Sequence, residues 1–89
     1  MLTNNQSQPI TAALEDIVRR FAPRDRAAIA IHPDSHLVNE VGIDSPRMID
    51  LVLDIEDRFG IIVDDDAVQR VRTFGEMVAL VSSLKGTES

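Results

Sequence analysis

The side chains with the most reactive chemistry are one serine and two histidines. Ser45 directly follows Asp44 at the start of an apolar segment, and His32 and His36 lie earlier in a polar connection. A serine nucleophile needs a nearby base and an oxyanion hole, and the chain has no Gly-x-Ser-x-Gly turn to expose one. The residues around Ser45 therefore argue against a hydrolase, and taken alone they favour a helix N-cap.

Two clusters have residue types that can bind metals, but neither has the required spacing. His32, Asp34 and His36 lie in the polar connection and are expected to be solvated. The run Asp64 to Asp66 lacks the alternate spacing, the glycine and the closing glutamate of a calcium loop. The chain has no cysteine, which removes disulfides and thiolate zinc sites and leaves a cytoplasmic location as the default. No metal site is predicted.

Composition and charge restrict the class of protein further. The chain has 89 residues, of which 44% are hydrophobic and 3% aromatic, so we expect one domain with an aliphatic core over about residues 10–84. The formal charge is −6, and residues 44–66 hold the whole excess with eight acids and two bases. This charge disfavours nucleic acid and anionic lipid as partners. No signal-peptide pattern or bilayer-length apolar run is present, so a soluble, unprocessed monomer without membrane insertion is expected.

The apolar spacing predicts an all-α fold, a small four-helix bundle with a long loop between the first two helices. The expected helices are residues 10–22, ended by Pro23; 46–59, ended by Gly60; 64–71; and 73–85, which opens with a capping box. A further short helix over residues 24–30 is expected inside the long connection. Leu37, Val41 and Ile43 are expected to attach that connection to the core.

The helix expected over residues 46–59 has an unusually wide apolar arc. Its charged residues share one outward arc, namely Arg47, Asp50, Asp54, Asp57 and Arg58. Apolar side chains fill the rest, which indicates that several neighbours surround this helix or that it lines an apolar cavity. Glu56 lies in the middle of the apolar arc, where an unpaired charge is costly, and is expected to be hydrogen-bonded in a structural role.

The motif Gly42-Ile43-Asp44-Ser45, followed by Leu51, Glu56, Phe59, Ile61 and Val63, resembles the acyl carrier protein family. The resemblance also includes the acidic second helix, the long first loop and the four-helix plan, and it covers roughly residues 10–84. It implies that Ser45 carries 4′-phosphopantetheine, delivered from coenzyme A by a separate transferase. Acyl groups would then be held as thioesters on the terminal thiol. The chain would be a carrier and not an enzyme.

The resemblance also implies roles for the neighbours of Ser45. Asp44 would orient the serine and face the transferase, although it could equally be a capping acid. The outward acids Asp50, Asp54 and Asp57 would dock partners with basic patches: the phosphopantetheinyl transferase and the acyl-loading, condensing and reducing enzymes. A phosphate on Ser45 would meet free N–H groups at the helix N-terminus. An acyl chain would be sheltered by the apolar arc and the residues opposite, namely Met48, Val52, Ile55, Phe59, Val63, Leu80 and Leu84.

Two residues depart from the family pattern. Pro46 stands where leucine usually follows the serine, and Arg47 adds a base to a surface expected to be acidic. Proline lacks an N–H and disfavours helical conformation before it, so Ser45 is expected to be an N-cap with Pro46 as the first helical residue. Both residues indicate dedicated partners in a specialised fatty acid or polyketide pathway. The alternatives are a peptidyl carrier, which usually has Gly-Gly before the serine, and an unmodified helical interaction module.

Overall fold

The structure is a computed structural model that describes residues 10–26 and 29–85. It contains four α-helices: α1 (Ile10–Phe21), α2 (Ser45–Phe59), α3 (Asp65–Arg70) and α4 (Phe74–Lys85). Within the described residues there is no strand, and the one β-type pairing is an isolated bridge between His36 and Thr73. The all-α four-helix prediction is confirmed.

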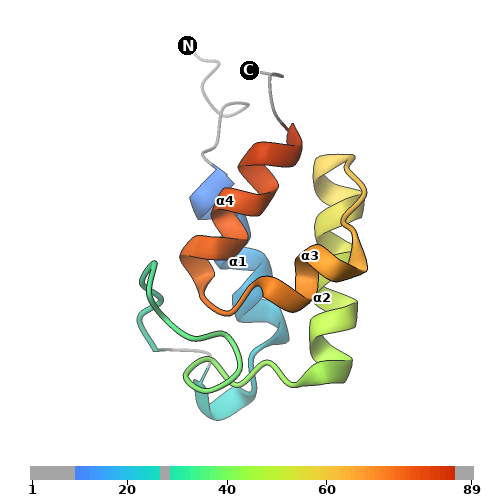
Figure 1. Ribbon diagram of the computed structural model, residues 1–89. Helices are drawn as coiled ribbons and strands as arrows, with labels where there is room; N and C mark the ends of the chain where they lie inside the picture. Colours follow the sequence, from blue (N-terminus) through green and yellow to red (C-terminus); the bar gives the residue numbers. More distant parts are fainter. Residues whose placement is uncertain (1–9, 27–28, 86–89) are drawn as a thin grey trace.

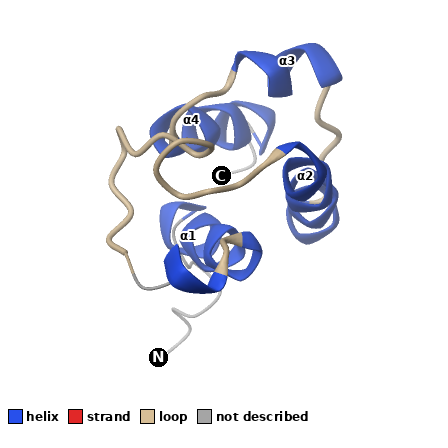
Figure 2. Cartoon of the chain, turned by 90° about the horizontal axis from the view of Figure 1, so that it is seen from below, coloured by secondary structure: helices blue, strands red, loops and turns tan. Residues whose placement is uncertain are grey.

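Three of the helices lie side by side, and the fourth crosses between two of them. Figure 1 shows α1 behind α4 with α2 beside them, and the view along the helices in Figure 2 shows α3 lying across between α4 and α2. α1 packs against both α2 and α4. The helical part of the core is at most 2% exposed and consists of Leu14, Ile17, Val18, Leu51, Ile55, Phe74, Met77 and Val81.

The end of α1 agrees with the prediction, but the short helix after it does not. α1 stops at Phe21, two residues before Pro23. The helix expected over residues 24–30 is only a three-residue 3₁₀ turn, η2 (Arg24–Arg26), closed by the N–H of Arg26 on the carbonyl of Pro23. Residues 27–28 lie outside the described residues, and Ile29 and Ala30 are not helical. Tertiary contacts override propensity here, because the guanidinium of Arg19 binds the carbonyl of Ile29 at 2.8 Å.

The long connection is attached to the core as predicted. Leu37, Val41 and Ile43 are all 0% exposed. The N–H of Leu37 donates to the carbonyl of Arg72, and the N–H of Phe74 donates to the carbonyl of Ser35. These bonds tie the loop to the start of α4, so the segment that leads into α2 has a defined path.

The predicted C-terminal end of α2 and the predicted start of α4 are confirmed. Gly60 has φ +66°, a left-handed conformation that suits glycine, and its N–H donates to the carbonyl of Glu56. The hydroxyl of Thr73 accepts from the N–H of Glu76, while the carboxylate of Glu76 accepts from the N–H of Thr73. The N–H of Arg72 also donates to that carboxylate, and these bonds lower the pKa of Glu76.

Candidate functional site

The start of α2 differs by one residue from the prediction, since Asp44 and not Ser45 is the N-cap. Asp44 has an extended backbone, and its Oδ1 accepts from the N–H of Arg47 at 3.1 Å. Ser45 is therefore the first helical residue and Pro46 the second. A residue before proline prefers an extended conformation, yet Ser45 is helical. This preference is overcome because the Asp44 carboxylate accepts a hydrogen bond from the Arg47 N–H, the amide of the third helical residue.

This arrangement leaves few backbone donors at the helix start. Pro46 has no N–H, the N–H of Arg47 is bonded to the Asp44 carboxylate, and the N–H of Met48 donates to the Asp44 carbonyl at 2.8 Å. Of the four amides at a helix start that have no helical partner, those of Asp44 and Ser45 have no bond within the described part of the chain. The expectation that a phosphate on Ser45 would meet free N–H groups therefore holds for two amides and not for the full set of a helix start.

Ser45 itself is exposed at the end of a firmly held segment. The preceding Ile43 is fully buried, and its N–H donates to the carbonyl of Leu37 at 2.9 Å. Gly42 has φ +87°, and a Cβ at this position would lie 3.0 Å from the Pro23 ring. Glycine is thus required where the chain turns past the end of α1. Buried anchors therefore present the Ser45 hydroxyl to solvent at a fixed place.

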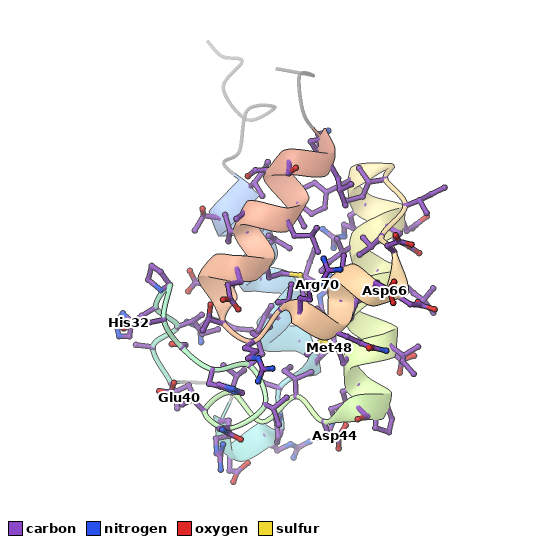
Figure 3. All side chains as sticks on the ribbon, viewed as in Figure 1. His32, Glu40, Asp44, Met48, Asp66 and Arg70 are labelled. Atoms are coloured by element: carbon purple, nitrogen blue, oxygen red, sulfur yellow. The ribbon has the colours of Figure 1, made fainter. Side chains whose placement is uncertain are left out.

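An apolar groove of about 610 Å³ runs between α2 and α3 and opens at Ser45. Figure 3 shows Met48 between these helices and Asp44 at the start of α2. Aliphatic side chains dominate its lining, which consists of Val38, Ile43, Met48, Ile49, Val52, Leu53, Val63, Val68 and Val71 together with the more polar Asp44, Ser45, Glu56, Asp65 and Gln69. The groove is open along one side, so a flexible chain could enter it lengthwise.

The structure brings together some of the predicted pocket residues and separates others. Met48, Val52 and Val63 line the groove. Ile55 instead lies in the core, where it is 1% exposed, and Leu80 lines neither the groove nor the second hollow. Phe59 and Leu84 border that second hollow, of about 210 Å³, at the far end of α2. A helical wheel shows which residues are apolar but not which neighbour each will face, and this accounts for the difference.

Several residues of the groove were not predicted from the sequence. Ile49 and Leu53 belong to the apolar arc of α2, and their spacing of four residues is the signal that could have placed them together. Val38 comes from the long loop, and Val68 and Val71 come from α3 and the residue that caps it. No local pattern in the sequence connects these three with α2.

Glu56 has the hydrogen-bonded structural role that was predicted. Its Oε2 accepts from the N–H of Val63 at 2.8 Å, across seven residues of chain. The bond holds the segment between α2 and α3 against α2. Because α3 follows directly, Glu56 helps to set the distance between the two walls of the groove.

Within the charged arc of α2 only Asp54 faces α1, and the exposed part of the helix is partly apolar. Ile49 is 63% exposed and Leu53 is 57% exposed, whereas the Asp54 side chain is only 25% exposed. Asp54 Oδ2 lies 3.7 Å from Nη1 of Arg20 on α1 and 4.0 Å from Nε of Arg58. Asp54 is therefore committed to the α1–α2 contact. The packing of Leu51 and Ile55 against α1 and α4 rotates α2 in this way, and leaves Asp50 and Asp57 as the exposed acids.

The remaining candidate residues show no sign of catalytic chemistry. His32 is exposed, and the Nδ1 of His36 accepts from the N–H of Asn39. The described residues do not gather three or more His, Cys, Asp or Glu side chains into a metal-binding group. None of the helices within residues 10–26 and 29–85 combines the length and the apolar character that crossing a bilayer requires.

The exposed hydroxyl and the adjoining groove fit a phosphate-linked arm that carries an apolar group. An anchored primary hydroxyl can form a phosphodiester, and an aliphatic groove that opens at the same residue can remove an apolar chain from water. The residues present therefore suit 4′-phosphopantetheine and an acyl cargo.

Comparisons with known proteins agree with this geometry. The phosphopantetheine attachment site family matches residues 12–81. The chain is 32% identical over 76 residues to an acyl carrier protein of Exiguobacterium sibiricum, covering 85% of this chain and 94% of that one. It is 34% identical to an acyl carrier protein of Thermotoga maritima over 60% of this chain and 65% of that one.

A third relative is a meromycolate extension acyl carrier protein of Mycolicibacterium aurum, 27% identical over 88% of this chain and 78% of that one. Because the family match spans most of the chain and includes the whole groove, the chain belongs to the phosphopantetheine attachment site family and is a phosphopantetheine-bearing acyl carrier.

Proposed function

We propose that Ser45 is the residue that bears the phosphopantetheine. The observation that carries this proposal is that Ser45 is exposed and lines the aliphatic groove between α2 and α3. When bound, the group supplies a terminal thiol that holds acyl groups as thioesters. The chain's own residues hold the attachment point still and shelter the cargo, and the protein itself catalyses no reaction.

The groove is proposed as the shelter for the acyl chain. Met48, Val52 and Val63 are the predicted pocket residues that support this role, and Ile49 and Leu53 extend the apolar wall toward solvent. Removing methylenes from water is favourable at about 0.8 kcal/mol for each one fully buried. The open side of the groove would let the cargo leave again when a partner enzyme binds.

The partners proposed are a phosphopantetheinyl transferase and the enzymes that load, condense and reduce the acyl chain. Asp50 and Asp57 are exposed on α2 and support docking to basic patches, while Ile49 and Leu53 offer an apolar centre to the same surface. Asp54 is left out of this surface because it pairs with Arg20. We further propose one carrier domain over about residues 10–84, acting as a monomer in the cytoplasm.

A specialised pathway is the proposed setting for this carrier. Pro46 and Arg47 are both exposed beside Ser45. Pro46 stands where the family usually has a leucine, so the surface here is stiffer and more basic than a leucine side chain would make it. Two classes of relative, general acyl carriers and carriers named for meromycolate extension, match the chain at similar identity. This supports a dedicated set of partner enzymes that act on acyl chains.

Intact-mass measurement after incubation with a broad-specificity transferase and coenzyme A tests the attachment residue. The wild-type protein is expected to gain the mass of one phosphopantetheine, and Ser45→Ala is expected to gain none. Ser82→Ala is the matched control, since Ser82 is also an exposed helical serine but lies on α4, away from the groove. A mass gain in Ser45→Ala, or none in the wild type, would contradict the proposal.

A further inference from the structure

The charge of a phosphate on Ser45 would be only partly balanced by the backbone at the start of α2. A phosphodiester carries a full negative charge at neutral pH, and helix starts usually stabilise such a group with several free amides. Here Pro46 has no amide proton and the amide of Arg47 is bonded to the Asp44 carboxylate, so only the amides of Asp44 and Ser45 remain free among the described residues. Asp44, the immediate neighbour, adds a second negative charge. A nearby basic side chain would therefore complete the compensation.

Arg47 is the basic side chain placed to provide it. Its Nη1 lies 3.7 Å from Oδ2 of Asp44, the residue bonded directly to Ser45. Side chains two positions apart do not normally face each other on a helix. Arg47 and Asp44 are three positions apart and do face each other, so the guanidinium lies beside the N-cap, next in the chain to Ser45. The Arg47 side chain is 45% exposed and can turn without disturbing the core.

Other arginines are less suited to this position. Arg58 lies eleven residues further along α2, about 16 Å away at 1.5 Å per residue, and it contacts Asp54. Arg26 comes near Gly42, but its Nη1 donates to the carbonyl of Glu40 at 3.0 Å. Arg47 therefore combines a position beside Ser45 with a single, exposed and weak ion pair.

We infer that Arg47 binds the phosphodiester on Ser45 and shifts from Asp44 to that phosphate when the prosthetic group is attached. Two guanidinium N–H groups can bind two phosphate oxygens at once, which a single amide cannot do. The inference rests on the proposed attachment at Ser45. It gives Arg47 a role within the modified carrier itself, in addition to any effect on partner enzymes.

The experiment compares modified and unmodified protein in wild type, Arg47→Gln and Arg58→Gln. The ³¹P resonance of the modified protein is expected to move in Arg47→Gln and to stay at the wild-type position in Arg58→Gln. At low salt, the melting temperature of the modified form relative to the unmodified form should fall by about 1–5 °C in Arg47→Gln only. High salt should remove that difference. Using the difference between the two forms cancels any effect of either substitution on the fold.

Pro46→Ala provides an independent test, because it returns an amide proton to the helix start. In the Pro46→Ala background, Arg47→Gln should change the ³¹P resonance and the melting difference less than it does beside proline. The inference is overturned if Arg47→Gln behaves like Arg58→Gln in both measurements. If the mass measurement shows no modification of the wild type, the proposed attachment fails as well, so the two failures are distinguishable.

Discussion

The length of the acyl chain should control the stability of the loaded carrier. We consider the protein modified at Ser45 and loaded with either an acetyl or an octanoyl group. The groove of about 610 Å³ has room for roughly 20 groups of the size of a water molecule or a methylene. The octanoyl chain, with six more carbons than acetyl, therefore fits within it.

The expected stabilisation of the octanoyl form depends on how much of the chain the open groove covers. A fully buried methylene is worth about 0.8 kcal/mol, and a groove that covers about half of the chain gives about 0.4 kcal/mol for each of six carbons. The sum is about 2.4 kcal/mol in favour of the folded octanoyl form. For a domain of this size, each kcal/mol raises the melting temperature by about 4–8 °C, so the octanoyl form should melt at least about 10 °C above the acetyl form.

Thermal melts followed by circular dichroism measure this difference. Val52→Phe, which narrows the groove, should remove most of it, whereas Ile62→Phe should not, because Ile62 is 84% exposed and outside the groove. Equal melting temperatures for the two wild-type forms would show that the chain stays in solvent. An equal loss in both variants would show that the effect arises elsewhere.

Three further predictions concern the exposed acids of α2, the two residues after Ser45, and the capping box at the start of α4. Reversal of Asp50 and Asp57 to lysine should slow modification by the transferase at low salt, and the difference in rate from wild type should shrink as ionic strength rises. Initial rates of modification are measured by mass spectrometry. Rates equal to wild type at every salt concentration would refute docking at these acids. The double change Pro46→Leu, Arg47→Asp should raise turnover by generic fatty acid synthase enzymes without changing the modification rate much. If wild type already serves those enzymes equally well, its partners are not specialised. Glu76→Gln should lower the melting temperature at neutral pH. This difference from wild type should disappear as the pH falls through the pKa of the Glu76 carboxyl, which lies below its ordinary value of 4.5, because protonated Glu76 no longer accepts hydrogen bonds as an anion. A difference in melting temperature that persists in acid would refute this prediction.

Much of the fold could be predicted because its signals are local. Pro23 and Gly60 mark helix ends through their own backbone restrictions, and the Thr73–Glu76 box marks a helix start within four residues. Such signals act between neighbours in the chain and need no tertiary partner. The motif Gly42-Ile43-Asp44-Ser45 could be recognised for the same reason, because its residues are contiguous.

The sequence alone therefore determined the four α-helices and most of their ends, together with the hydrogen-bonded role of Glu56 and the family that the Ser45 motif indicates. Tertiary structure decided how α2 is rotated, because an apolar arc this wide is compatible with several orientations until α1 and α4 bury Leu51 and Ile55. That rotation directs Asp54 toward Arg20 and exposes Leu53. The groove also depends on packing, because residues from the long loop and from α3 meet α2 only when the core brings distant segments of the chain together.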